Sequence, residues 1–330
     1  MTQDAALPKA LPTALPKAII VAGPTASGKS ALAIAIAQRL GGVIINADSM
    51  QVYQDLRIVT ARPTSAEEAQ IPHRLYGVRR ASEPGSAAWW REAALAEMAT
   101  AHAAGQLPII CGGTGMYFSA LLNGLADIPD PGPAAREEAR RLLAEEGPAA
   151  LHTRLTSADP GTAARLKPTD SQRLARAWEV LRGTGHGMAH WHAHTTPPAP
   201  WRLKAILLDP PRPDLRAAIA TRFTAMLDTG ALDEIRALLA QNLDPALPAM
   251  RAHGVPELAA HLRGATTLAQ AAARAEIATG QYTKRQATWF RHHELSNCGP
   301  AHTIHARFTD LAQFSESESA EIFHFIQNQT

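Results

Sequence analysis

The stretch Gly23-Pro-Thr-Ala-Ser-Gly-Lys-Ser30 decides the fold, because it matches the phosphate-binding pattern G-x-x-x-x-G-K-[ST] at every fixed position. Gly23 and Gly28 let the backbone curl so that several N–H groups point inward at an anion. Lys29 adds a positive charge, and the Ser30 hydroxyl is a ligand for Mg²⁺. The predicted phosphate site is completed by Pro24, Thr25, Ala26 and Ser27.

The flanking residues supply the strand and the helix that such a loop needs. Residues 18–22 form a short apolar run of strand type, and residues 30–40 are rich in Ala and Leu and are followed by Gly41 and Gly42. The helix N-terminus adds a partial positive charge to the anion site. This context argues against a chance match in a Gly-rich turn. A nucleoside triphosphate, a kinase substrate and a simple diphosphate ester would all fit the loop.

The composition is ordinary for a soluble globular protein. The chain has 330 residues, a hydrophobic content of 46% and a formal net charge of +2, so any nucleic-acid role must come from local basic patches. Cys111 and Cys298 have no metal or redox spacing, which fits a reducing cytosol. We expect a cytoplasmic protein with no membrane span and no obligate protein partner. Prolines in residues 1–16 predict a disordered lead-in.

Further strand patterns lie at residues 42–46 and 107–111, with a long helical pattern at 86–104 between them. Strands that alternate with helices predict an α/β fold with a parallel sheet. Ligands bind at the carboxyl ends of such strands. We therefore expect the loop at 23–30, Asp48 and Thr114 to meet at one rim of the sheet.

Two segments rich in Pro, at 127–133 and 195–200, bracket a charged helical stretch. This pattern predicts a helical insertion at 128–200 in a core made of 17–127 and 201–300. Residues 201–208 have strand composition and return the chain to the core, and helices are expected at about 212–229, 231–241 and 266–292. We expect residues 301–330 to be a loosely held tail.

Asp48 and Thr114 are the main candidates for chemistry. Asp48 directly follows a strand, where a carboxylate can hold Mg²⁺, accept a proton or cap a helix. Ser49, Gln51 and Tyr53 add hydrogen-bonding groups, and Gln suits the N6/N7 edge of adenine. Thr114 lies between glycines that let a ligand approach the backbone, although an N-cap role would also explain it.

Two segments have the composition of a nucleic-acid contact. Gln172, Arg173 and Arg176 cluster off the apolar stripe of a helix, where they predict contacts to phosphates or bases or simply a solvated face. Residues 284–291 mix basic and aromatic side chains, which suits a backbone and an unstacked base but also an amphipathic helix. A His-rich stretch at 186–194 is a weak zinc candidate, because it lacks Cys and carboxylates.

An ordered series of motifs then resembles one family. The series is the phosphate loop, Ala47-Asp-Ser-Met-Gln-Val-Tyr53, Thr60-Ala-Arg-Pro63, Pro72-His73, Gly112-Gly-Thr-Gly-Met-Tyr117, Asp170-Ser-Gln-Arg173 and Lys284-Arg-Gln-Ala-Thr-Trp289. It is similar to the bacterial tRNA dimethylallyltransferases, also called tRNA isopentenyltransferases, from about residue 17 to residue 291. The resemblance implies a P-loop NTPase-like parallel sheet core with a helical insertion domain that closes over the tRNA anticodon stem-loop.

The resemblance also implies a reaction, the transfer of a dimethylallyl group from dimethylallyl diphosphate to N6 of adenosine at position 37 of tRNA. The tRNAs concerned read codons that begin with U. By this resemblance, the loop at 23–30 corresponds to the family's diphosphate site, with Mg²⁺ near Ser30. Asp48 corresponds to the family's general base, and Arg222 to a further diphosphate contact. Thr114 resembles the residue beside the reacting nitrogen.

The family touches tRNA at positions that carry the following residues here: Asp48, Ser49, Met50, Gln51, Thr114, Arg136, Gln172, Arg173, Leu174, Ala175, Arg176, Arg251, Lys284, Arg285 and Arg291. Family members are often monomers, and the loop itself is also typical of ATP-binding proteins.

The chain departs from the family pattern at Gly254-Val-Pro-Glu257, where Gly-Tyr-Arg-Gln is usual. Arg62 replaces a usual Lys and Val59 a usual Gly. A P-loop small-molecule kinase is the alternative function, and a nucleotide-gated RNA-binding protein is a third. Asp48 distinguishes the enzymes from the binding protein, because only the enzymes need its carboxylate.

Overall fold

The computed structural model describes residues 15–327, so the lead-in predicted for 1–16 lies almost wholly outside the described residues. The chain divides into two compact units. The first combines Met1–Leu122 with Ala199–Thr330, and the second is Asn123–Pro198. Each unit has its own hydrophobic core.

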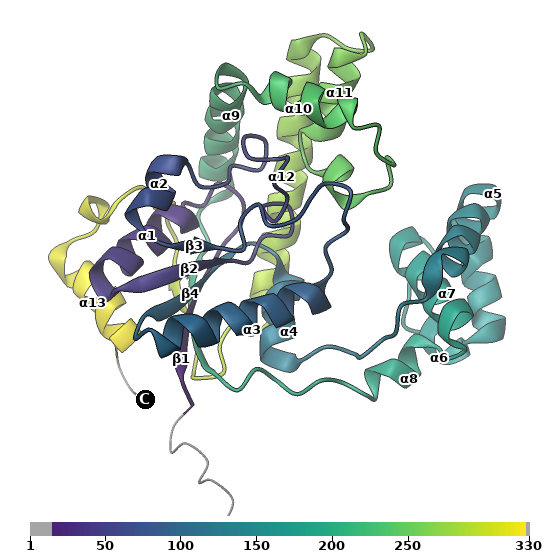
Figure 1. Ribbon diagram of the computed structural model, residues 1–330, viewed down its shortest axis with the longest axis horizontal. Helices are drawn as coiled ribbons and strands as arrows, with labels where there is room; N and C mark the ends of the chain where they lie inside the picture. The colour runs from purple at the N-terminus through teal and green to yellow at the C-terminus, as the bar shows by residue number, and fades with distance from the viewer. Residues whose placement is uncertain (1–14, 328–330) are drawn as a thin grey trace, which may run out of the picture. The chain divides into compact units, whose positions relative to one another are not determined.

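The first unit is built on a parallel sheet of six strands in the order β3-β2-β4-β1-β5-β6 (Figure 1). The strands are β1 (Lys17–Ala22), β2 (Gly42–Asn46), β3 (His73–Arg74), β4 (Leu107–Gly112), β5 (Arg202–Leu208) and β6 (His302–Ile304). The α/β fold is confirmed, and the four strands that the sequence predicted in it are present to within one residue at either end. Neither β3 nor β6 was predicted.

Strand β1 lies inside the sheet, with a neighbouring strand on each edge and helices on both faces. It pairs with β4, with Ile19 opposite Ile109, and with β5, with Ile19 opposite Lys204. Residues 18–22 are all fully buried. A parallel strand that is covered on both faces needs a continuous apolar run, which residues 18–22 provide.

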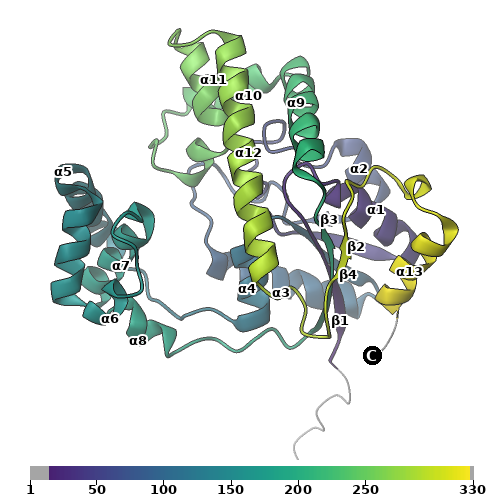
Figure 2. The same cartoon turned by 180° about the vertical axis from the view of Figure 1, so that it is seen from behind.

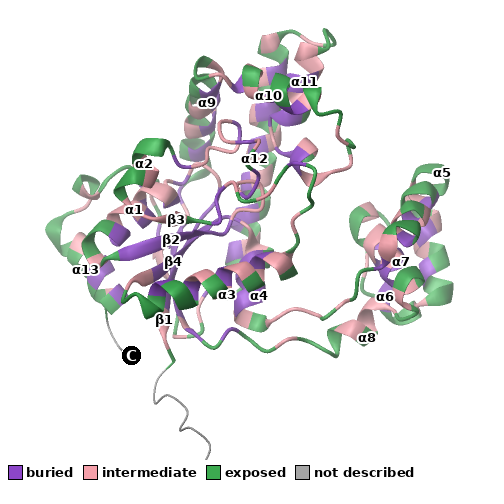
Figure 3. Cartoon of the chain, viewed as in Figure 1, coloured by how far each residue is buried: buried purple, intermediate pink, exposed green. Residues whose placement is uncertain are grey.

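Helices cover both faces of the sheet (Figures 1 and 3). Ile20 and Ile45 pack with Trp90 of α3 (Ala87–Ala103) and Phe118 of α4 (Gly115–Asn123). On the opposite face Ile19 and its neighbours pack against α1 (Lys29–Leu40) and α13 (Glu316–Gln327). The strand alternation sends successive side chains into these two layers.

The prediction of a loosely held C-terminal tail is wrong. After β6, the 3₁₀ turn η2 (Leu311–Gln313) leads into α13, whose Ile322, Phe323 and Ile326 are buried in the core. The spacing of these three residues gives α13 one apolar face, and that face has a sheet to cover.

A group of helices stands at one end of the sheet (Figure 2). It contains α9 (Arg212–Asp228), α10 (Ala231–Ala240), η1 (Pro248–Arg251), α11 (Val255–Leu262) and α12 (Leu268–His292). Their apolar side chains form a third cluster with Val52, Tyr53 and Leu56 from the loop after β2. That loop also contains the short helix α2 (Ser65–Gln70). Helices α9 and α12 lie side by side.

The second unit is helical. It contains α5 (Gly132–Ala158), α6 (Pro160–Ala163), α7 (Ser171–Thr184) and α8 (Met188–His192). Gly147, with φ of 78°, breaks α5 into two helical segments. Leu142 and Leu155 of α5 pack with Leu174 and Trp178 of α7. Since Leu174 is fully buried, its side chain belongs to this core and the predicted contact with tRNA through it is corrected.

Candidate functional site

The phosphate loop between β1 and α1 is held in a strained conformation that glycine permits. Gly28 has φ of 91°, and Ala26 also has a positive φ of 67°. A Cβ atom on Gly28 would lie 1.9 Å from the carbonyl oxygen of Phe308. The Phe308 N–H donates to the Ser27 carbonyl over 2.9 Å, and the Arg307 Nε donates to the Ala26 carbonyl over 3.0 Å. The segment after β6 therefore supports the loop directly.

The loop contains polar groups that lack protein partners. The Ser27 Oγ is buried and has no hydrogen-bond partner. Lys29 is only 9% exposed and makes no ion pair with any residue in 15–327. Burial lowers the pKa of Lys29, an effect that the nearby Asp48 opposes. A buried cation and an unpaired hydroxyl are both stabilised by an anionic ligand.

Asp48 lies in a turn after β2 and caps no helix, since the next helix, α2, begins at Ser65. The Asp48 N–H donates to Asn46 Oδ1 over 2.8 Å, and the Met50 N–H donates to Asp48 Oδ1 over 2.9 Å. Asn46 is buried, and its Nδ2 donates to the carbonyls of Asp48 and Leu75. These bonds hold the carboxylate in place and occupy one of its two oxygens.

Thr114 is tied to the same turn. Its N–H donates to the Ala47 carbonyl over 3.1 Å, and its Oγ1 accepts from the Ser49 N–H over 3.0 Å. A Cβ on Gly112 would lie 2.1 Å from the Ala47 oxygen, so a glycine is needed where the two strand ends approach. The predicted meeting of Asp48 and Thr114 at one rim is confirmed. The Thr114 hydroxyl accepts from the turn at Ser49 and not from the first turn of α4.

Gln286 of α12 joins the phosphate loop to the loop that contains Thr114. Its Oε1 accepts from the Thr25 N–H and its Nε2 donates to the Gly113 carbonyl, each over 2.9 Å. Only 4% of Gln286 is exposed. This role of Gln286 was not predicted from the sequence. The available signal was a polar amide on the buried stripe of α12, with Thr279, Thr283, Ala287 and Phe290.

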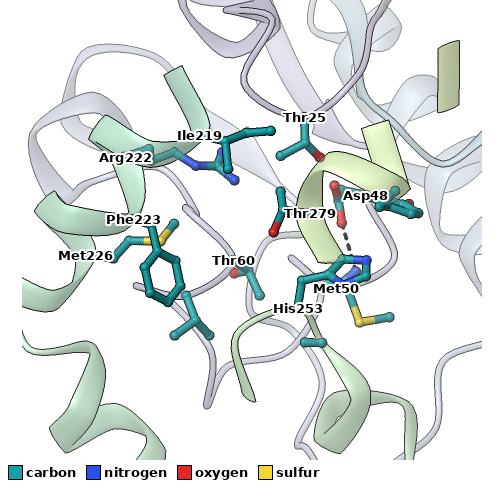
Figure 4. Close-up of a pocket in the computed structure, with 13 residues that line it drawn as sticks. Thr25, Asp48, Met50, Thr60, Ile219, Arg222, Phe223, Met226, His253 and Thr279 are labelled. Atoms are coloured by element: carbon teal, nitrogen blue, oxygen red, sulfur yellow. Dashed lines mark hydrogen bonds between the residues drawn. The ribbon is translucent and has the colours of Figure 1, made fainter. Parts of the chain in front are cut away.

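A cavity of about 60 Å³ opens between these loops, α9 and α12. Figure 4 shows Arg222 and Phe223 entering it from one side and Asp48 and His253 from the opposite side, with Thr25 nearby. Burial lowers the pKa of Arg222, and Asp48 opposes that shift. The guanidinium makes no ion pair or hydrogen bond with another described residue of the chain. The Arg222 guanidinium and the Asp48 carboxylate thus face a common space.

Two further residues of this cavity have rings. Tyr282 of α12 lines the cavity, and burial raises the pKa of its hydroxyl well above the ordinary range. His253 lies against Tyr282 with ring centroids 4.9 Å apart, and burial lowers its pKa. Near neutral pH both side chains are therefore uncharged. Aromatic or imidazole rings at 253 and 282 suit a pocket for a planar base.

The predicted tRNA contacts of the first unit divide into exposed and engaged groups. Arg251, Lys284, Arg285 and Arg291 are all exposed. Gln51 is engaged, since its Nε2 donates to the carbonyls of Thr60 and Ala61 over 2.8 Å each and so serves the loop itself. Phe290 is buried in the core, so the prediction that it could stack on a base is corrected.

The predicted contacts of the second unit lie mainly on its surface. Gln172 and Arg173 are exposed, and Ala175 and Arg176 are partly buried. Each arginine has a nearby carboxylate, with Arg136 paired to Asp130, Arg173 to Asp170 at 3.5 Å and Arg176 to Glu179 at 3.3 Å. Exposed ion pairs contribute only about 0–1 kcal/mol, so these arginines can exchange their partners for phosphates.

Two other sequence features have structural explanations. Gly254-Val-Pro-Glu257 starts α11, which was not predicted, and Glu257 Oε2 accepts from the Gly254 N–H over 3.0 Å. His186 and His190 lie with ring centroids 4.2 Å apart, yet no group of three His, Cys, Asp or Glu between residues 15 and 327 could hold a metal ion. No helix in that part of the chain is long and apolar enough to cross a membrane.

Comparisons with known proteins agree on one family. The family model described as IPP transferase matches residues 51–293. The tRNA dimethylallyltransferase of Acidiphilium cryptum is 63% identical over 309 residues, which cover 93% of this chain and 94% of the relative. That of Gluconacetobacter diazotrophicus is also 63% identical and covers 93% of each chain.

Solved structures agree with the sequence relatives. The tRNA isopentenylpyrophosphate transferase of Bacillus halodurans is 30% identical with a TM-score of 0.66, and the match covers 94% of this chain and 97% of that one. A eukaryotic dimethylallyltransferase captured acting on tRNA has a TM-score of 0.78 at 28% identity and covers 96% and 80%. The core is thus P-loop NTPase-like, as predicted. The chain belongs to the tRNA dimethylallyltransferase family, a family of prenyltransferases that act on tRNA.

Proposed function

We propose that the protein transfers a dimethylallyl group from dimethylallyl diphosphate to N6 of adenosine 37 in tRNAs that read codons beginning with U. The observation that carries the proposal is the bridge made by Gln286. It joins the phosphate loop to the Thr114 loop, and Thr114 is in turn bonded to the turn of Asp48. An anion site and a proton acceptor are thus fixed beside one cavity.

The anion site serves the leaving group. In the reaction the bond between C1 of the dimethylallyl group and a diphosphate oxygen breaks, and a bond from C1 to N6 of adenine forms. An allylic carbon tolerates positive charge by delocalisation, so the main demand is to stabilise the departing diphosphate. The loop N–H groups, Lys29 and Arg222 are the groups proposed to do so, and the burial of both cations supports this role. Binding the diphosphate also offsets the burial of both cations.

Asp48 is the proposed general base. N6 carries a positive charge once it bonds to C1, and Asp48 takes one of its protons, which leaves a neutral secondary amine. The Met50 N–H fixes Asp48 Oδ1 and leaves the second oxygen for the proton. Thr114 and Tyr282 supply hydrogen-bonding groups beside this carboxylate.

Mg²⁺ is the proposed cofactor, and the donors of the site fit it. Ser30 follows Lys29 at the start of α1, and the residues described include no cage of three His, Cys, Asp or Glu. Such a donor set suits an ion that takes most of its oxygen ligands from diphosphate and water. When bound, Mg²⁺ would add positive charge beside the leaving diphosphate, with the Ser30 hydroxyl as the protein ligand.

The proposed RNA substrate is the anticodon stem-loop. Adenosine 37 must leave its stack to reach Asp48, at a cost of a few kcal/mol. The neutral rings of His253 and Tyr282 offer the flipped base a surface inside the cavity. Arg251, Lys284 and Arg285 on the first unit and Arg136, Arg173 and Arg176 on the second are the proposed contacts to the rest of the loop.

The proposal is tested with purified protein, Mg²⁺, labelled dimethylallyl diphosphate and an unmodified tRNA transcript that has A37. A transcript with G37 is the matched control, since it differs at the target base alone. We expect label in the A37 transcript only, and nucleoside analysis should recover N6-dimethylallyladenosine. Equal labelling of both transcripts would contradict the proposed target. Consumption of ATP on a small acceptor, with no labelled tRNA, would support the kinase.

A further inference from the structure

A second groove, lined by several cationic side chains, lies outside the reaction cavity, between the N-terminal half of α9 and the C-terminal half of α12. Its volume is about 90 Å³. Four cationic side chains line it, namely Arg212, Arg216, Lys284 and Arg291. Asp209 is the only carboxylate among its lining residues. The residues Arg212 and Arg216 have no part in the site described above.

The cations of this groove are poorly neutralised by the protein. Arg212, Arg216 and Lys284 are exposed, and none of them makes a hydrogen bond or an ion pair through its side chain with another residue in 15–327. Arg291 is paired with Asp209 at 3.4 Å. Several arginines elsewhere on the surface are paired locally, such as Arg141 with Glu145 and Arg236 with Asp233. The groove therefore keeps a local excess of positive charge.

The start of α9 adds to this charge. Pro211 occupies the N-cap position and offers no side-chain hydrogen bond, so the first N–H groups of this 17-residue helix have no side-chain cap. The helix dipole places a partial positive charge at the same point. Asp214 in the first turn offsets part of it. The four cationic side chains and the helix start still leave the groove with a net positive charge, since only Asp209 and Asp214 oppose them.

We propose that this groove binds the phosphate backbone of the tRNA substrate, outside the cavity in which the base reacts. The inference rests on the proposed function for the identity of the RNA. The arrangement favours a polymer over a small diphosphate. Arg212 and Arg216 are about 6 Å apart along α9, and Lys284 and Arg291 are about 10 Å apart along α12. Cations spread over such lengths can contact successive phosphates, which one diphosphate cannot reach.

The same helices line the groove and the reaction cavity, since α9 carries Arg222 and α12 carries Tyr282 into that cavity. Arg212 and Arg222 are ten positions, or about 15 Å, apart along α9. The groove thus fixes the RNA at a second point on the elements that hold the reacting groups.

The test compares the full-length wild type with the double variant Arg212→Gln/Arg216→Gln. The matched control is Arg263→Gln/Arg274→Gln, which removes the same charge from exposed, unpaired arginines of the same unit. The Kd for an unmodified A37 transcript is measured from 50 to 300 mM salt, without turnover. Each lost phosphate contact should reduce the slope of log Kd against log salt concentration by about 0.7–0.9, so the groove variant should lose about 1.4–1.8.

We expect the control to keep the wild-type slope, and the groove variant to bind weakly to all tRNA transcripts alike. Equal slopes for the groove variant and the wild type would overturn the proposal, as would equal losses in both variants. A higher KM for dimethylallyl diphosphate with an unchanged slope would assign the groove to the small substrate and overturn it too. A slope change in a protein that prenylates no tRNA would support the groove while contradicting the proposed reaction.

Discussion

The bridge at Gln286 gives a quantitative prediction. The variant Gln286→Met keeps a flexible side chain of similar length but removes both hydrogen bonds, to the Thr25 N–H and the Gly113 carbonyl. Each buried group left without a partner costs about 1–3 kcal/mol. Gly113 is buried and Thr25 is partly exposed, so water offsets part of the cost of leaving the Thr25 N–H without a partner. We expect the free energy of unfolding to fall by about 2–4 kcal/mol, or several degrees in Tm.

The same variant should weaken binding of the prenyl donor, because Thr25 belongs to the phosphate loop. If the disturbed loop loses about 1.4 kcal/mol of binding free energy for dimethylallyl diphosphate, the KM for this substrate rises about tenfold. Gln286→Glu separates the two bonds, since its carboxylate can still accept from Thr25 but cannot donate to Gly113. The control is Gln281→Met, at an exposed position of the same helix.

The measurements are thermal or urea unfolding and steady-state kinetics with dimethylallyl diphosphate varied at saturating tRNA. We expect both Gln286 variants to fall below the control in Tm, and Gln286→Met, which loses the bond to Thr25, to exceed the control in KM. A Gln286→Met protein with the Tm and KM of the wild type would show that the bridge has no energetic role. A lower Tm with an unchanged KM would limit that role to stability.

Three other predictions concern single side chains. Asp48→Asn keeps the acceptor for the Met50 N–H but removes the base, so kcat should fall about 10²–10⁴-fold at unchanged tRNA affinity. A variant that turns over at the wild-type rate would exclude Asp48 as the base. Burial lowers the pKa of His253, so the unfolded chain binds more protons and the free energy of unfolding falls as pH drops below 6.5. Urea unfolding at pH 7 and pH 5 should show a smaller loss of stability for His253→Val than for the wild type. An equal loss in the two proteins would refute this prediction. Burial raises the pKa of Cys111 to about 12, so iodoacetamide at pH 8 should label only Cys298 in the native protein and both cysteines in denaturant. Labelling is measured by mass spectrometry. Labelling of Cys111 in the native protein would contradict the prediction.

The sequence was most informative where structure depends on local patterns. The phosphate loop has a fixed spacing, and the buried parallel strands are continuous apolar runs, so both were predicted with nearly correct bounds. The meeting of Asp48 and Thr114 followed from topology, because parallel strands end at one edge of the sheet. No distance information was needed for either prediction.

The missed features depend on partners that are distant in sequence. Gln286 and Thr25 are separated by 261 positions, and only the folded chain shows that they meet. The C-terminal helix was missed because Glu316, Glu318 and Glu321 dominate its composition, although Ile322 and Ile326 mark an apolar face. Leu174 was assigned to an RNA contact by the family resemblance alone, whereas the fold buries its side chain between α5 and α7.

The support of the phosphate loop by the C-terminal segment has a consequence for how the protein is made. Arg307 binds the carbonyl of Ala26 across 281 positions of the chain. At about 5–20 residues per second, the ribosome takes roughly 15–55 s to synthesise that interval. During this time the nascent chain holds the loop sequence without the backbone that fixes it. We therefore expect the anion site to mature only as synthesis ends, and a chain that terminates before residue 307 to lack a competent loop even though the whole signature motif is present.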